Sequence, residues 1–166
     1  MRRLASALAL CAVLLAGCGG GEGKTTRSGP SKAAPVHRRG QAQGVAAYRA
    51  AVEGALGAYA AVQRRTFRSL RGADAPRFGA ALRRLRRATR RAADRLQAAR
   101  PPGPVAAPNR RLVTAFRALA AILGTAIQAR DRGDFAQLRR VGRRLRSGEF
   151  SRPIVRAARQ IDASLR

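Results

Sequence analysis

Apolar side chains recur every three or four residues from Val45 to the end of the chain, which is the spacing of one face of an α-helix. The first such stretch, from Val45 to Leu70, places the following residues on one face: Val45, Tyr48, Val52, Ala55, Tyr59, Val62 and Thr66, widened by Leu56, Phe67 and Leu70. No segment shows the period of two that is typical of strands. The pattern therefore predicts an all-α fold.

The second stretch has the most regular repeat in the chain. Asp74 is its predicted N-cap, and Pro76 falls in the first turn, where no backbone donor is needed. An apolar seam then follows a four–three alternation over three heptads: Phe78, Leu82, Leu85, Thr89, Ala92, Leu96 and Ala99. This alternation is typical of a helical bundle or a coiled coil.

A run of prolines separates the second helix from the third. Pro101-Pro102-Gly103-Pro104 must interrupt the helix, so the third one is predicted to begin at or slightly before Pro108 and to end at Gly133. Its buried stripe is predicted to contain Leu112, Phe116, Leu119, Ile122, Leu123, Ala126 and Ile127.

Two short helices follow. Asp134 is the predicted cap of a fourth helix that ends at Gly148, and the last helix is predicted to start at Ser151. The residues expected to face inward are Phe135, Leu138, Val141, Gly142 and Leu145 in the fourth helix, and Ile154, Ala158, Ile161 and Leu165 in the fifth. The Asp131-Arg132-Gly133-Asp134 segment is interpreted as a C-cap followed by an N-cap rather than as a calcium turn.

Short connections favour antiparallel neighbours, so the expected architecture is an antiparallel helical bundle of three long helices plus two short ones. About 120 residues, 45–166, suffice for one modest core. These residues are predicted to form a single bundle domain.

The N-terminus has the layout of a cleavable export signal, predicted to span residues 1–17. Arg2 and Arg3 precede an apolar run from Leu4 to Leu15, and small residues then lead to a cysteine. The apolar run is shorter than the roughly 20 residues that a membrane-spanning helix needs. A plain secretory signal is the alternative reading.

Leu15, Ala16, Gly17 and Cys18 resemble, in order, the lipobox of bacterial lipoproteins. The resemblance implies cleavage between Gly17 and Cys18, a diacylglycerol thioether on Cys18 and possible acylation of the new amino terminus. It also implies anchoring to membrane lipid on the extracytoplasmic face of the cell membrane. No cofactor other than this covalent lipid is expected.

Residues 18–44 are predicted to form the lipidated cysteine and a flexible, disordered basic linker, because Gly, Ser, Thr, Pro and basic residues predominate without apolar periodicity. The body is also similar to small Arg/Ala-rich helical lipoproteins of GC-rich bacteria. That likeness rests on Leu96 to Arg100, Pro101-Pro102 and Arg110 to Val113, and it supplies no activity.

Arginine dominates the charge of the chain. The 35 basic residues, 33 of them Arg, face 8 acidic ones, which gives a formal net charge of +27. Candidate anion-binding residues lie in two clusters: Arg83, Arg84, Arg87, Arg90 and Arg91, and Arg139, Arg140, Arg143 and Arg144. Arg suits phosphate because its planar fork donates two hydrogen bonds at once. A solvated face chosen by codon bias explains the same clusters.

Catalytic chemistry has little support in the sequence. The only histidine, His37, lies in the predicted linker, Cys11 leaves with the signal, and Cys18 carries lipid, so neither a hydrolytic triad nor a metal site is expected. Among the remaining carboxylates, Glu53, Asp94, Glu149 and Asp162, no spacing singles out a pair. No catalytic residue is assigned, and the protein is expected not to be an enzyme.

The sequence thus predicts a non-enzymatic envelope lipoprotein that binds or scaffolds an anionic lipid or wall polymer through its arginine-rich helix faces. Specific nucleic-acid binding is not expected, because the few aromatic residues lie at seam positions and offer no stacking platform. The alternative is an extracytoplasmic binding protein for a small or peptide ligand within the bundle, which predicts a cavity with convergent polar groups. The oligomeric state is left open.

Overall fold

The computed structural model describes the backbone of residues 35–70 and 74–165, and the side chains of these ranges from Gly44 onward. These residues form helices and turns, with no strand among them, which confirms the predicted all-α class. The predicted signal peptide, Cys18 and the predicted linker up to residue 34 lie outside the described residues.

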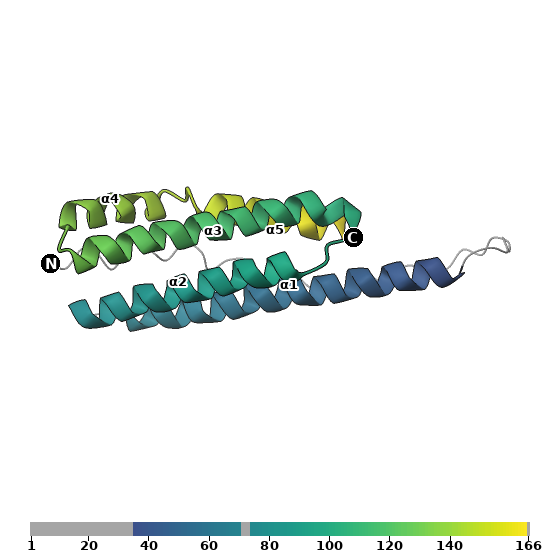
Figure 1. Cartoon of the computed structure of the whole chain (residues 1–166), viewed down its shortest axis with the longest axis horizontal. Helices are drawn as coiled ribbons and strands as arrows, with labels where there is room; N and C mark the ends of the chain where they lie inside the picture. Colours follow the sequence, from purple (N-terminus) through teal and green to yellow (C-terminus); the bar gives the residue numbers. More distant parts are fainter. Residues whose placement is uncertain (1–34, 71–73, 166) are drawn as a thin grey trace.

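Five helices form the bundle: α1 (Pro35–Ser69), α2 (Ala75–Ala98), α3 (Gly103–Asp131), α4 (Phe135–Arg146) and α5 (Ser151–Ser164). Successive long helices run in opposite directions, and α4 and α5 follow one another along α3 (Figure 1). In sequence order, α1 packs on α2, α2 packs on α3, and α3 packs on both α4 and α5. The result is an antiparallel bundle with α3 at its centre.

The core consists of two apolar clusters along the bundle. The first joins α1, α2, α3 and α5, and its largest fully buried members are Phe116, Leu96, Leu112 and Val105. The second joins α2, α3 and α4 around Leu82, Leu85, Leu123 and Val141. The seam residues predicted on the first three helices are all buried or half-buried, so the apolar pattern located the core correctly.

Tyr59 links the two clusters from α1. It packs against both of them, and its ring meets that of Phe116 edge to face, with centroids 5.1 Å apart and an interplanar angle of 82°. Such a pair contributes about 0.5–1.5 kcal/mol beyond the area that it buries. Tyr59 therefore stabilises the packing of α1 against the central helix α3.

A buried polar chain ties three helices together at the other end of the first cluster. Tyr48 Oη donates to Asn109 Oδ1 at 3.0 Å, and Asn109 Nδ2 donates to the carbonyl oxygen of Leu96 at 3.0 Å. That carbonyl lies in the last turn of α2, where intrahelical donors run out. Asn109 thus supplies, from α3, a hydrogen bond that α2 cannot supply itself.

Among the described helices, α3 is long and apolar enough to cross a membrane. It is also the central helix of the bundle, and 67% of its most apolar window is buried against the rest of the protein. Its hydrophobicity is therefore accounted for by the bundle core.

Two helices begin earlier than predicted. α1 starts at Pro35 rather than Val45, so its first turns include residues assigned to the linker. Pro at the first helical position is favourable, and the Arg, Gln and Ala residues that follow are good helix formers. In Figure 1 this end of α1 projects beyond the other helices. The limits of the linker and of the bundle domain remain predictions.

The start of α3 is likewise earlier, at Gly103, and Pro108 lies inside the helix instead of opening it. Pro104 occupies the first turn, where its missing N–H costs nothing. The additional turns bury Val105 completely in the first cluster. Burial of this side chain offsets the one backbone hydrogen bond that Pro108 removes.

The predicted starts of α2 and α4 are confirmed by their caps. Asp74 accepts a hydrogen bond from the backbone N–H of Arg77 at 2.9 Å, and Asp134 accepts one from Gln137 at 2.8 Å. Gly133 and Gly148 have φ values of 70° and 79°, the left-handed region that glycine tolerates best. The Asp131–Asp134 segment is therefore a pair of caps, as predicted.

Phe135 does not face inward. It is 66% exposed, whereas Val141 of the same helix is 2% exposed. Phe135 is the first residue of α4, directly after its Asp134 cap, and α3 has already ended at Asp131. Periodicity assigned it to the inner face, but no neighbouring helix reaches far enough to cover it.

Candidate functional site

The arginines predicted on α2 are all exposed. Arg83 Nη1 lies 3.8 Å from Asp131 Oδ1, a contact that reaches from α2 to the end of α3. Arg84, Arg87 and Arg91 have no hydrogen-bond or ion-pair partner among the described residues. Arg90, the remaining member of the cluster, lines a groove described below.

The arginines predicted on α4 divide into engaged and unpartnered residues. Arg140 Nε donates to Gln137 Oε1 at 2.8 Å, and Arg144 binds Glu149 through two hydrogen bonds of 2.9 and 2.5 Å. Arg139 and Arg143 have no partner within the described part of the chain. Figure 1 shows α3 between α2 and α4, so the two predicted clusters lie on helices that flank the central helix.

Glu149 and Arg144 form the best-defined ion pair of the described surface. The hydrogen bond from Arg144, together with its charge, lowers the pKa of the Glu149 carboxyl, and the pKa of Arg144 is raised in return. The Arg144 guanidinium also stacks 5.3 Å from the ring centroid of Phe150. These contacts fix the α4–α5 turn, which makes Arg144 a structural residue rather than a free anion ligand.

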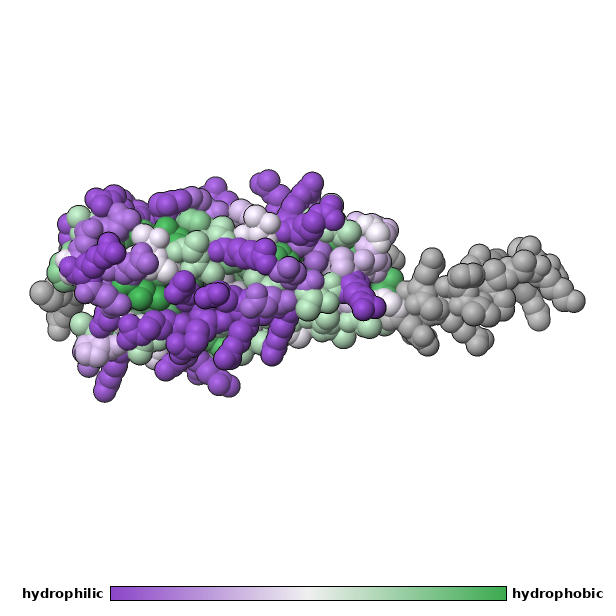
Figure 2. Space-filling view, viewed as in Figure 1, coloured by the Kyte–Doolittle hydropathy of each residue, from purple (hydrophilic) through white to green (hydrophobic). Residues whose placement is uncertain are grey.

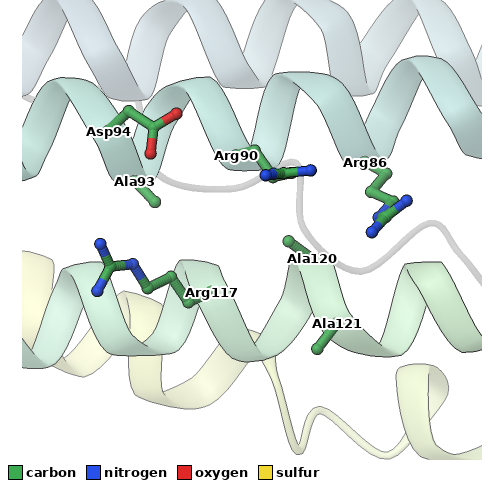
Figure 3. A pocket seen from close by; sticks show the side chains of 7 residues that line it. All are labelled: Arg86, Arg90, Ala93, Asp94, Arg117, Ala120 and Ala121. Atoms are coloured by element: carbon green, nitrogen blue, oxygen red, sulfur yellow. The ribbon is translucent and has the colours of Figure 1, made fainter.

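A basic groove follows the seam between α2 and α3 (Figure 3). We call it the α2–α3 groove. It has a volume of about 310 Å³, is open to solvent, and is lined by Arg86, Arg90, Ala93, Asp94, Arg117, Ala120 and Ala121. Figure 3 shows Arg86, Arg90 and Asp94 projecting from α2 and Arg117 from the facing stretch of α3.

Small residues shape this seam. A Cβ on Gly124 of α3 would lie 3.3 Å from Arg86 Nε, so the bare glycine lets the Arg86 side chain lie flat across α3. Further along, the Arg130 guanidinium of α3 covers Gly79 of α2 and donates to the Ala75 carbonyl oxygen at 2.9 Å. Arginine stems thus cross between the helices where the opposite helix has no side chain.

The donors in the α2–α3 groove are only partly used. Arg117 Nη2 donates to Gln97 Oε1 on α2. Arg86 Nε is shielded from solvent and donates to no described residue, and Arg90 also lacks a described partner. Three guanidinium groups and the single carboxylate of Asp94 give this groove a net charge of about +2 at neutral pH.

A second groove lies between α3 and α5 and holds Arg111, Arg152 and Arg156 with Glu149, in a volume of about 540 Å³. Its guanidinium groups are more fully engaged. Arg111 donates to Gln160 Oε1 at 3.3 Å, and Arg152 donates to the Ser147 carbonyl oxygen at 2.7 Å. Glu149 is already held by Arg144. Fewer arginines of the α2–α3 groove than of this second groove donate to protein acceptors.

Arg86 and Arg117 were missed as candidates by the sequence analysis. Arg86 belongs to the α2 run but is not among its candidate residues, and Arg117 is an isolated charge in an apolar helix. Their juxtaposition depends on the register of α2 against α3. The short connection through Pro101 and Pro102 was the available signal, because it fixes that antiparallel register approximately.

The carboxylates do not converge in either groove, since Asp94 lies in the first and Glu149 in the second. Among the described residues, no three His, Cys, Asp or Glu side chains are grouped closely enough to hold a metal ion.

Comparison of the chain with models of known protein families, with curated proteins and with solved structures finds no match.

Proposed function

We propose that this protein is a non-enzymatic lipoprotein of the cell envelope that binds anionic envelope components, either lipid headgroups or wall polymer, through arginines on its helical bundle. Cys18 would carry the lipid anchor, and the linker would hold the bundle near the extracytoplasmic membrane face. The protein would act by tethering or scaffolding, without chemistry at the bound anion.

The observation that carries this proposal is the uncompensated guanidinium charge on α2 and α4. Arg84, Arg87, Arg91, Arg139 and Arg143 are exposed and lack an acidic partner among the described residues. Hydrophilic side chains cover much of the face seen in Figure 2, interrupted by apolar patches. An anionic surface placed against such a face would relieve the repulsion between neighbouring arginines.

The alternative function, a binding protein for a small ligand, is favoured by one observation. The α2–α3 groove is lined by alanines and by polar side chains from two helices, which is the kind of lining that the alternative requires. It lies at the surface rather than inside the bundle.

The anchor is tested by expressing the full chain and its Cys18→Ser variant in a bacterium and separating membrane from soluble protein. We expect the unchanged chain in the membrane fraction, resistant to high salt, with an N-terminal peptide carrying the mass of the lipid. If both chains fractionate alike and no lipid mass is present, the anchor is wrong.

The binding role is tested with residues 18–166 carrying the Cys18→Ser substitution, so that neither a lipid nor the apolar segment from Leu4 to Leu15 contributes to binding. Co-sedimentation with anionic and with neutral vesicles, and with purified wall polymer, is measured across a salt series. Saturable binding to an anionic target near physiological salt supports the proposal. Equal, weak binding to every polyanion that disappears with modest salt contradicts it, because bulk charge alone then accounts for the result.

A further inference from the structure

We infer that the end of the bundle around Phe135 is a docking surface for an anionic lipid bilayer, with Phe135 inserted below the headgroups and Arg132 and Arg139 bound to lipid phosphate. We call this surface the distal end, and it comprises the described residues 64–70, 74–78 and 130–139. The inference rests on the proposed function and makes it more specific, because it selects lipid over wall polymer and places the contact at one end of the bundle.

The distal end lies opposite the start of α1. Figure 1 shows the end of α1, the start of α2, the end of α3 and the start of α4 together there. Three of the five phenylalanines of the chain belong to it, Phe67, Phe78 and Phe135, and none of the three is fully buried. By contrast, Phe116 in the middle of α3 is 0% exposed. The molecule therefore keeps aromatic surface where its helices stop.

Phe135 is held toward solvent by a tight turn. It is the most exposed large apolar side chain among the described residues, at 66%. Its backbone N–H donates to the Gly133 carbonyl oxygen at 2.9 Å, and the N–H of Asp134 donates to the Ala129 carbonyl oxygen at 2.8 Å. The ring is therefore presented on a fixed backbone, and its insertion requires no segment to become ordered. A single exposed apolar side chain is common on protein surfaces, so the charges around it decide what it can contact.

Two unpartnered guanidinium groups flank the ring. Arg132 precedes Phe135 by three residues, and Arg139 follows it by four, one turn further along the same face of α4. Both arginines are exposed and have no hydrogen-bond or ion-pair partner among the described residues. Their long side chains can reach phosphate groups at the level of the headgroups while the ring between them lies deeper.

The carboxylates of the distal end are already in use. Asp74 and Asp134 accept hydrogen bonds from backbone N–H groups as helix caps, and Asp131 accepts one from Arg130 Nη1 at 2.7 Å. The described residues of the distal end include seven arginines against these three aspartates, a net charge of +4: Arg64, Arg65, Arg68, Arg77, Arg130, Arg132 and Arg139. This end therefore attracts an anionic surface.

The pairing of an aromatic ring with unpartnered arginines favours a bilayer over other occupants. Aromatic side chains partition to the boundary between headgroups and acyl chains, and each basic residue near an anionic bilayer adds attraction to it. A wall polymer supplies the negative charge but no apolar phase for the ring. A second copy docked through the same end would bring like charges together. Of these three occupants, the anionic bilayer alone satisfies both the ring and the arginines.

The first experiment removes the ring. Residues 18–166 carrying Cys18→Ser are compared with the same chain carrying Phe135→Ala, after circular dichroism has verified that both are folded. Sedimentation at constant ionic strength gives the affinity for phosphatidylglycerol vesicles and for purified anionic wall polymer. We expect Phe135→Ala to lower the affinity for vesicles by about tenfold and to leave the affinity for the polymer unchanged. Unchanged affinity for vesicles overturns the inference and leaves anion binding by the arginine faces standing, whereas absence of binding to either anionic target overturns both proposals.

The second experiment removes the flanking charges. Arg132→Gln with Arg139→Gln is compared with Arg84→Gln and Arg110→Gln together, which remove the same charge from exposed positions outside the distal end. We expect the first pair to lower the affinity for phosphatidylglycerol vesicles by about tenfold or more and the control pair to change it much less. Equal losses in the two double variants overturn the inference, because bulk charge then accounts for the binding.

The third experiment reports insertion directly. The chain has no tryptophan, so Phe135→Trp introduces a single indole at the distal end. We expect its fluorescence to shift to the blue on phosphatidylglycerol vesicles and to be quenched by brominated lipid. Ala163→Trp, at an exposed position of α5 at the other end of the bundle, is the control and should show neither change. Equal responses of the two reporters overturn the inference.

Self-association is measured on the same chains by sedimentation velocity without lipid. We expect Phe135→Ala to leave the molecular mass unchanged. A complex that dissociates when Phe135 is replaced shows that a second copy covers the ring, and overturns the inference.

Discussion

At the scale of single residues, the buried Asn109 side chain connects three helices through hydrogen bonds. It is 4% exposed, accepts from Tyr48 and donates to the Leu96 carbonyl, so α1, α2 and α3 meet at one amide. Because both of its partners are otherwise unpaired, this contact also fixes the register of the three helices.

We expect Asn109→Leu to destabilise the protein by about 2–3 kcal/mol, because the Tyr48 hydroxyl and the Leu96 carbonyl both lose their partner in the core. Urea unfolding followed by circular dichroism measures the difference. Gln128→Leu, at an exposed position of the same helix, serves as the control and should change stability by less than about 0.5 kcal/mol. Equal effects of the two substitutions would show that the buried chain contributes nothing.

Tyr48 also gives the stability a defined dependence on alkaline pH. Burial raises the pKa of its hydroxyl above the usual value of 10.0, because the phenolate is poorly solvated in the core. The unfolded chain therefore releases this proton first. The stability that the neutral, buried Tyr48 hydroxyl contributes is fully present below about pH 10 and is lost as the pH rises through the pKa of this group in the folded state.

The corresponding measurement is the free energy of unfolding between pH 8 and 11, for the unchanged chain and for Tyr48→Phe. We expect the stability of the unchanged chain to fall more steeply with rising pH than the stability of Tyr48→Phe. Tyr59 and the two lysines are present in both chains, so the difference between the slopes belongs to Tyr48. Identical slopes would contradict the raised pKa.

At the scale of elements, the packing of α2 on α3 depends on close approach at Gly79. Arg130 covers this glycine and donates to the Ala75 carbonyl. A methyl group at this position would overlap the guanidinium and displace it from its acceptor.

We expect Gly79→Ala to destabilise the protein by about 1 kcal/mol. The lost charge-assisted hydrogen bond, about 1.5–3 kcal/mol, outweighs the usual gain of about 0.5–1 kcal/mol from replacing glycine in a helix. Gly54→Ala in α1, where a methyl group meets open space, should show that gain alone. Thermal unfolding of both variants decides the matter, and a stabilising Gly79→Ala would show that Arg130 is not held in place.

The elements also show what sequence periodicity can determine. The seams of the first three helices and the caps at Asp74 and Asp134 followed from spacing and local hydrogen bonding, which are properties of one helix at a time. The starts of α1 and α3 do not follow from spacing, because residues 35–44 have no apolar periodicity and Pro108 resembles a helix start although the helix extends back to Gly103 and buries Val105. The same limit applies to Phe135, whose exposure depends on where α3 ends.

The candidate site could be predicted from the sequence less completely than the fold. Arg90 was identified from the run of arginines on α2, but Arg117 became a candidate only once α3 was placed against that helix. Two helices form the groove. The residue spacing within one helix does not show which residues of the other helix will face it. The position of Gly124 beneath Arg86 illustrates this, since neither residue is notable in its own helix.

At the scale of the whole molecule, a net charge of +27 opposes compaction, and the helices add local repulsion of their own. Arg83 and Arg91 lie four residues on either side of Arg87, and Arg84 and Arg90 lie three residues on either side, so Arg87 takes part in four like-charge pairs. Each pair costs about 0.2–0.5 kcal/mol at low ionic strength. Added salt screens this repulsion, because the Debye length falls to about 10 Å at 0.1 M.

We therefore expect the melting temperature to rise as sodium chloride increases from about 0.01 to 0.3 M, and Arg87→Gln to raise stability at low salt by about 1–2 kcal/mol. This gain should disappear at the higher salt concentration. Arg110→Gln removes the same charge where no other arginine lies three or four residues away, so its effect isolates the contribution of net charge. A melting temperature that falls with salt would instead mean that attractive pairs such as Arg144–Glu149 outweigh the excess of arginine. In that case the arginine faces would not need an anionic partner, and the main physical reason for the proposed binding role would be removed.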